Sequence, residues 1–413
     1  MACLYPRTYM VRRRYFTPAD NMRYSEVKVG CGKCAGCLSD RQDSIAARAL
    51  IQSRQYPYMY LITLTYDENN IPISRVTFDV DVSTGEMSVH DTLSIVERGS
   101  EEYQRAGVLL RQVPKSKQLR SISSEFDLSD FVENECLYTH YSNTLNYDDV
   151  KKYFKRVRRS FEYRSKARLD FSYLIAGEYG FRFSRPHYHI LLFFKEAISK
   201  KLSDLFNSQW IFGRTDFRKV GYTAKDKTCV SKYVAKYMSK GKLFENKSVG
   251  FGFCVKPRIC ASLHFGQILS PSEMDYYRCF DIYGRYNINQ PEKTLTNEQI
   301  KVICERMFKR FKYNFGEDSF SLPSCCISRL FRYRLQGGVS FWCKIYVLAR
   351  DYARDVSLAD NQRKYSEFCT ANGFSENSLE AFAAYERHKE MLAHAANSRL
   401  VKTLSQHYAK SKF

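Results

Sequence analysis

Residues 185–194 constrain the fold more than any other part of this chain. They read RPHYHILLFF, an apolar and aromatic run typical of a buried β-strand. Successive side chains of a strand point to opposite faces, so His187 and His189 lie on the same face. Two imidazoles on one face can bind a metal ion together, and we predict a metal site here.

A β-hairpin is expected to bring a carboxylate to these histidines. Residues 171–176 predict the first strand, and glycine and proline between the strands favour a turn. Antiparallel pairing then returns Glu178 close to His187. Two imidazoles and one carboxylate form a facial set that leaves coordination positions open for substrate and water. Asp170 and Glu162 are alternative third ligands.

Two tyrosines lie four positions apart in residues 228–240, which predict a helix. Tyr233 and Tyr237 share one face of that helix, and we call them the tyrosine pair. Each is followed three residues later by a lysine, Lys236 and Lys240. An alternative interpretation is an amphipathic helix whose tyrosines pack on a sheet.

A run of cysteines near the N-terminus has the spacing of a metal knuckle. Cys31, Cys34 and Cys37 are separated by two residues each, and Cys3 could supply a fourth thiolate. Four thiolates would close a tetrahedral structural Zn²⁺ site. An iron–sulfur cluster or free thiols are the alternatives.

The remaining patterns suggest three segments. Residues 1–54 hold the cysteine run and a helix over 39–54, residues 55–245 hold the strands and the tyrosine pair, and residues 246–413 have no assigned role. Residues 67–145 read as a long, polar, irregular insert. Residues 379–404 predict one or two amphipathic helices. The fold class is therefore α+β, with an antiparallel sheet of about five strands, flanking helices and a mostly helical C-terminal extension.

The charge of the chain favours a polyanionic partner. Lys and Arg number 65 against 44 acidic residues, a formal charge of +21, and 15% aromatic residues would suit stacking on unpaired bases. We expect no signal peptide and no membrane-spanning segment, because no apolar run is long enough. The sequence has no phosphate-binding loop of the GxxxxGK[ST] type, so strand separation is expected to need a separate helicase.

Taken together, these motifs resemble the HUH endonucleases, and the paired tyrosine resembles replication initiators of microviruses, the small icosahedral single-stranded DNA phages. Three motifs occur in the order of the rolling-circle motifs, namely LITLTY, HYH and YVAKY. The similarity extends to the motifs CGKC, GEYG and RPHYH, and it covers most of residues 31–66 and 145–242. The insert after Tyr66 and the tyrosine between the two histidines depart from the family pattern.

This resemblance implies rolling-circle replication. One tyrosine of the pair would attack a strand of single-stranded or supercoiled origin DNA, forming a 5′-phosphotyrosine link that is later rejoined to release circles. The facial set would bind Mg²⁺ or Mn²⁺, and Lys236 and Lys240 would stabilise charge. A host helicase and polymerase in the bacterial cytoplasm are implied. The alternatives are a two-tyrosine transposase or relaxase, and a non-catalytic zinc-containing nucleic-acid-binding protein.

Overall fold

The protein is described here by a computed structural model. The residues that it describes are 7–12, 24–32, 34–81, 87–112, 121–124, 135–180, 185–237, 254–279, 296–331 and 341–410. The chain forms two compact units, one of Arg48–Gly266 and one of Met1–Ala47 together with Gln267–Phe413. The division at residues 54 and 245 stays a prediction. Of the described helices, none has the length and apolar character needed to cross a membrane.

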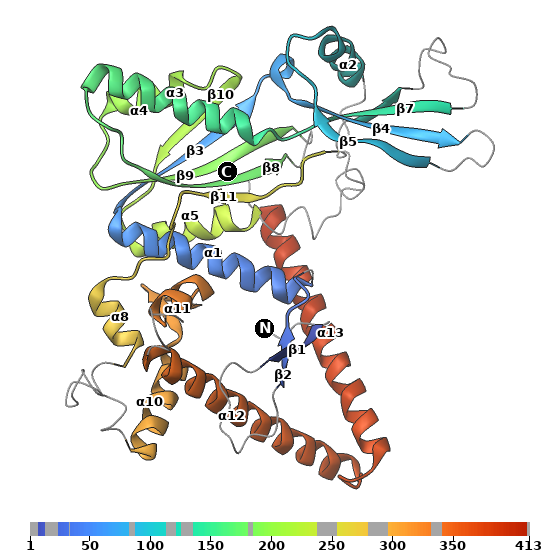
Figure 1. Cartoon of the computed structure of the whole chain (residues 1–413), viewed down its shortest axis with the longest axis vertical. Helices are drawn as coiled ribbons and strands as arrows, with labels where there is room; N and C mark the ends of the chain where they lie inside the picture. The colour runs from blue at the N-terminus through green and yellow to red at the C-terminus, as the bar shows by residue number, and fades with distance from the viewer. Residues whose placement is uncertain are drawn as a thin grey trace. The chain divides into compact units, whose positions relative to one another are not determined.

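A five-stranded antiparallel sheet organises the unit of Arg48–Gly266 (Figure 1). Its strand order is β10-β3-β9-β8-β11, and each neighbouring pair is antiparallel. The strands are β3 (Tyr58–Tyr66), β8 (Ser172–Tyr179), β9 (Pro186–Phe194), β10 (Gly213–Lys219) and β11 (Ile259–Ala261). The predictions of an α+β fold and of a five-stranded antiparallel sheet are confirmed.

The two faces of this sheet carry different side chains because strand residues alternate. Ile62, Ile175 and Ile190 lie side by side on one face, in a core that also includes residues of α3 and α4. The opposite face carries the histidines and contacts α5. Figure 1 shows α3 and α4 on one side of the sheet and α5 on the other. These helices are α3 (Tyr147–Ser165), α4 (Lys200–Ser208) and α5 (Ala224–Ala235).

Residues 67–145 are ordered where the structure describes them, so the prediction of an irregular insert is wrong. They include a second antiparallel sheet of order β5-β4-β7-β6 and a helix. These elements are β4 (Ile73–Asp81), β5 (Met87–Ile95), α2 (Glu101–Gln112), β6 (Ser121–Ser124) and β7 (Glu135–Asn143). A small apolar cluster, with Ile73, Val96, Ala106 and Leu110 buried, joins the helix to the sheet. An antiparallel sheet can pack one face on apolar residues and expose the other to water, so many of its positions can be polar. This explains the polar sequence of the insert.

An ion pair links this inserted segment to helix α3, which packs on the five-stranded sheet. Arg98 donates two hydrogen bonds to the carboxylate of Asp149 in α3, at 3.0 and 2.6 Å. The hydroxyl of Tyr66, at the end of β3, donates to the same carboxylate at 2.8 Å. The Asp149 side chain is only 3% exposed, so these donors replace the water that its charge would otherwise need.

Removal of the Asp149 carboxylate is therefore expected to be strongly destabilising. We expect Asp149→Ala to lower the free energy of unfolding by about 3 kcal/mol, because it leaves a partly buried guanidinium without its partner. Asp148→Ala is the matched control, since its ion pair with Lys151 is exposed and should be worth less than about 1 kcal/mol. Urea unfolding followed by Trp210 fluorescence in a Trp342→Phe background measures both. Equal losses would contradict the prediction.

The second unit is mostly helical in its C-terminal part, as predicted. Its described strands form two hairpins, β1 with β2 and β12 with β13. The elements are β1 (Arg7–Arg12), β2 (Tyr24–Val29), α8 (Pro271–Tyr277), α10 (Asn297–Arg310), β12 (Lys312–Phe315), β13 (Asp318–Ser321), α11 (Ser324–Leu330), α12 (Phe341–Asn372) and α13 (Leu379–Lys410). The segment expected to form one or two helices over 379–404 is the single helix α13. Helix α1 (Ala35–Gln55) begins earlier than predicted, directly after Cys34.

Candidate active site

Strand register assembles the predicted metal ligands. Glu178 of β8 pairs directly with His187 of β9, as the hairpin prediction requires. His189 lies two residues further along the same strand and therefore on the same face. Among the described residues, Glu178, His187 and His189 form a group whose ligand atoms all lie within 4.8 Å of one another. The alternatives, Asp170 and Glu162, are exposed and do not join this group.

The chemistry of this group suits a cation. The Nε2 atoms of His187 and His189 lie 3.0 and 3.1 Å from the same carboxylate oxygen, Oε2 of Glu178. Glu178 and His189 are each 6% exposed, so little water can solvate the carboxylate. Three electron-pair donors that face one another in a buried place are best satisfied by a positive charge between them. The group could hold a divalent metal ion.

The Nδ1 atoms of both imidazole rings contact neighbouring oxygen atoms. His187 Nδ1 lies 3.0 Å from the carbonyl oxygen of Arg185, an acceptor to which it can only donate. His189 Nδ1 lies 3.2 Å from Oγ1 of Thr63, its pairing partner on β3. Such contacts fix the ring and leave the Nε2 lone pair free for a metal. Thr63 is not among the predicted site residues, although alternation along β3 places it on the histidine face.

Burial also keeps the imidazoles in the form that binds metal. Desolvation lowers the pKa of His187 and lowers the pKa of His189 well below its ordinary value. A histidine with a lowered pKa is neutral at pH 7, and only the neutral ring has a free lone pair. The two histidines are therefore poised as ligands at neutral pH.

Helix α5 supplies the tyrosine pair. Its N-terminus is capped by Thr223, whose hydroxyl accepts a hydrogen bond from the backbone N–H of Asp226. The helix starts earlier than predicted and ends at Ala235, but Lys236 keeps helical angles of φ −60° and ψ −27°. Tyr233 and Tyr237 consequently stay on the same side, with ring centroids 5.2 Å apart.

Both tyrosines contact one metal-ligand candidate. The ring of Tyr237 stacks on the ring of His189, with centroids 4.4 Å apart and 7° between the planes. The ring of Tyr233 meets His189 edge-on at 5.5 Å. Tyr237 is 6% exposed, whereas Tyr233 is half-buried and thus more accessible. The pair and the facial set are parts of one site.

A lysine lies close to both rings. Lys236 Nζ is 4.4 Å from the ring centroid of Tyr233 and 5.5 Å from that of Tyr237. Burial raises the pKa of Tyr233, so its phenol stays protonated at neutral pH. Burial also lowers the pKa of Lys236 to about 8. A charged Lys236 can stabilise a phenolate next to it. The other lysine of the prediction, Lys240, lies outside the described residues.

The cysteine run forms a second candidate metal centre, in the other unit. The Sγ atoms of Cys31, Cys34 and Cys37 lie within 4.8 Å of one another. Gly32 between the first two adopts φ +71°, a left-handed angle that favours glycine in the tight turn. The backbone N–H of Cys34 donates to Sγ of Cys31 at 3.3 Å, and Cys37 lies in the first turn of α1. A hydrogen bond to the sulfur and a position at a helix N-terminus both stabilise a thiolate. Cys3 lies outside the described residues.

Two comparisons find known proteins to which this chain is similar. Residues 136–242 match the family model of the replication-associated protein ORF2. The chain is also similar to replication-associated protein ORF4 of Chlamydia phage 1, with 28% identity over 145 residues, which are 30% of this chain. The match spans 35% of that relative's length. No solved structure matches the chain.

The family match covers most residues of the candidate active site, though not Thr63. It includes the facial set and the tyrosine pair but leaves out the cysteine run and every described residue from 254 onward. Together with the phage relative, it confirms the resemblance to a microvirus-like replication initiator.

Proposed function

We propose that this protein initiates rolling-circle replication by cutting one strand of a DNA origin with a tyrosine. The observation that carries the proposal is the convergence of two tyrosines on His189, a residue of a buried three-ligand group. A structural tyrosine pair would not need buried metal ligands, and a metal site alone would not need two phenols. The similarity to replication-associated proteins supports the same conclusion.

The first step is a transesterification. The phenol oxygen of one tyrosine forms a bond to the scissile phosphorus, and the bond from phosphorus to the 3′ oxygen breaks. The phenol loses its proton, the 3′ oxygen gains one, and the 5′ phosphate stays linked to the protein. Mg²⁺ or Mn²⁺ held by the facial set would supply positive charge to the phosphate. Tyr233 is the more accessible phenol, and we assign the first cut to it.

The second tyrosine allows the ends to be rejoined. After a round of synthesis, Tyr237 cuts the regenerated origin, and the 3′-hydroxyl that this cut frees attacks the link on Tyr233. That attack restores a phosphodiester, closes a circle and returns the first phenol. Because each exchange makes one ester bond and breaks another, no nucleotide is consumed. The spacing of 5.2 Å between the rings supports alternation at one phosphate site.

The proposal assigns charge stabilisation to Lys236 and predicts a pH dependence. Its pKa is lowered to about 8, so the ammonium is present below that pH and lost above it. Wild-type adduct formation should rise with pH up to about 8 as the phenol ionises, and then level off, because the loss of the ammonium offsets the further gain in phenolate. Lys236→Arg keeps its charge, so its rate should continue to rise. Single-turnover adduct rates from about pH 6 to about pH 10 measure this, and identical profiles would exclude the role.

The partners follow from the chemistry. The DNA is expected to be single-stranded or supercoiled at the cut site, because the phosphate must be reached on an unpaired strand. A helicase and a polymerase would come from a bacterial host, in whose cytoplasm the reaction would take place.

We propose a structural Zn²⁺ ion for the cysteine run. The three clustered cysteines can fill three positions of a tetrahedral zinc site, and Cys3 is the proposed fourth ligand. Purified protein should contain about one zinc per chain, and Cys34→Ser should lose it. Cys229→Ser is the control, because Cys229 is an exposed free thiol outside the cluster. Atomic absorption measures the content. Zinc retained in the Cys34→Ser protein, or iron in its place, would refute the assignment.

The whole proposal is tested by adduct formation. The protein is incubated with supercoiled DNA of its replicon and with circular single strands, in Mn²⁺ or in EDTA, and separated on a denaturing gel. We expect a covalent complex in Mn²⁺ and none in EDTA. Tight binding without any covalent complex would favour the binding-protein alternative.

A further inference from the structure

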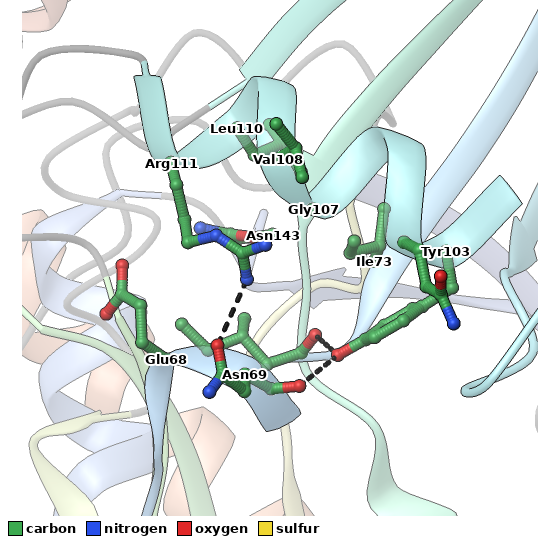
Figure 2. A pocket seen from close by; sticks show the side chains of 11 residues that line it. Glu68, Asn69, Ile73, Tyr103, Gly107, Val108, Leu110, Arg111 and Asn143 are labelled. Carbon is green, nitrogen blue, oxygen red and sulfur yellow. Dashed lines mark hydrogen bonds between the residues drawn. The ribbon is translucent and has the colours of Figure 1, made fainter. Parts of the chain in front are cut away.

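A cavity of about 330 Å³ lies beside α2, in the inserted segment of residues 67–145 (Figure 2). Its walls come from helix α2, from the start of β4 and the turn before it, and from the end of β7. We call it the α2 cavity and define it by Glu68, Asn69, Ile73, Gly107, Arg111 and Asn143. Its volume is at the lower end of the ~300–1,000 Å³ usual for small-ligand sites.

An amide that is available to a ligand lines the α2 cavity. Asn143 is 6% exposed, and within the described part of the chain its side-chain amide makes no hydrogen bond. The same side chain lines the cavity (Figure 2). Its donor and its acceptor can therefore both pair with a ligand that enters the cavity.

The other walls restrict what this ligand is. Ile73 and three further aliphatic side chains, those of Ile71, Val108 and Leu110, give the cavity apolar surface. Near its mouth, Arg111 donates to the Asn69 side-chain oxygen at 3.2 Å. Tyr103 does not compete for a ligand, because its hydroxyl already binds the carbonyls of Asn69 and Ile71 (Figure 2). A flat ligand with apolar faces and with both donors and acceptors on its edge suits this lining.

A nucleobase has these properties. Asparagine is a common reader of base edges, because its amide offers one donor and one acceptor side by side. A base can enter such a pocket only when it is unpaired and turned out of its stack. Arg111, exposed at the mouth, could contact the phosphate that follows.

A short series of contacts links a wall residue of the α2 cavity to the candidate active site. Glu68, on its wall, accepts an ion-pair hydrogen bond from Arg185. The carbonyl of Arg185 in turn accepts from Nδ1 of His187, a member of the facial set. One ion pair and one residue therefore separate the cavity wall from a metal ligand. A strand lying across the facial set has its neighbouring bases within reach of this wall.

We propose that the α2 cavity binds one unpaired base of the substrate strand and thereby selects the sequence beside the cut. The proposal rests on the proposed function, since it assumes a single-stranded DNA substrate. It gives the inserted segment a role in choosing the origin, separate from the chemistry of the tyrosine pair.

Two variants remove the pocket without removing the fold. At Gly107, an added Cβ would have no atom closer than 3.8 Å, the distance to side-chain atoms of Ile73 and Arg111. Gly107→Leu therefore fits the helix and fills the cavity, and leucine has the higher helix propensity. Asn143→Leu replaces the unpaired amide by an apolar group of similar size. Both should melt at or above the wild-type temperature. Arg105→Leu, exposed on the same helix and outside the lining, is the matched control.

The test is selection from a pool of short single-stranded oligonucleotides of random sequence, bound in EDTA and sequenced. Wild type and Arg105→Leu should prefer one base at one position by about 10-fold or more. Gly107→Leu and Asn143→Leu should lose that preference and keep the others. An unchanged base profile in both variants, or no base preference in wild type, would overturn the proposal. Binding in EDTA needs no cleavage, so this result is independent of whether adducts form.

Discussion

The double variant Tyr233→Phe/Tyr237→Phe is expected to form no covalent complex with DNA. It removes both phenol oxygens and leaves both rings, so packing against His189 should persist. Loss of a nucleophile costs about 10⁴-fold or more in rate, which puts an adduct below detection. Binding to the same DNA should stay within a few-fold of wild type.

The single variants separate the two roles. Tyr237→Phe should still nick supercoiled DNA but release no circles, since the second cut needs a second phenol. Tyr233→Phe should lose most of the initial nicking, because Tyr237 is almost fully buried. Agarose gels of the nicked and circular products measure both activities. A Tyr237→Phe protein that nicks and also releases circles would disprove the alternation.

The variant Glu178→Gln should lose metal binding and, with it, the reaction. The amide keeps the size of the side chain but removes the one negative charge of the facial set. We expect Mn²⁺ binding by calorimetry to weaken by about 10²-fold or more, and adduct formation to fall by about 10²- to 10³-fold. High Mn²⁺ concentration should restore part of the rate, because the two histidines remain.

Glu162→Gln is the control for this experiment. Glu162 is an exposed residue of α3 and is an alternative ligand on the sequence alone. The Glu162→Gln protein should bind Mn²⁺ and form adducts as wild type does. Equal Mn²⁺ affinity in Glu178→Gln and wild type would show that the carboxylate is not a ligand.

Most of the sheet could be predicted because its strands have strong local signals. The run containing His187 and His189 is apolar or aromatic along its length, which is typical of a strand buried on both faces. Helix α3 carries its own start signal, since Asn146 caps it and accepts from the N–H of Asp148 at 3.1 Å. The insert could not be predicted. Its strands are stabilised mainly by pairing with one another, and pairing between distant segments leaves little trace in composition.

The candidate site was predictable only where a ligand lies near its partner in the chain. Glu178 and His187 belong to one hairpin, so antiparallel pairing alone brings them together. Thr63 and Arg98 belong to other strands or to the insert, and their contacts with His189 and Asp149 join residues 126 and 51 positions apart. No spacing rule reports such contacts. The α2 cavity was missed for the same reason, because Asn143 reads as one more polar residue of a polar segment.

The most direct measurement is to identify the residue that carries the DNA. Protein is reacted with an origin oligonucleotide in Mn²⁺, digested with nuclease and trypsin, and examined by mass spectrometry. We predict a nucleotide attached through a 5′ phosphate to the tyrosine of the peptide that contains Tyr233. In a Tyr233→Phe protein, any remaining adduct should be on Tyr237. A 5′ adduct on any other residue, or cleavage that leaves no covalent intermediate, would contradict a tyrosine nickase.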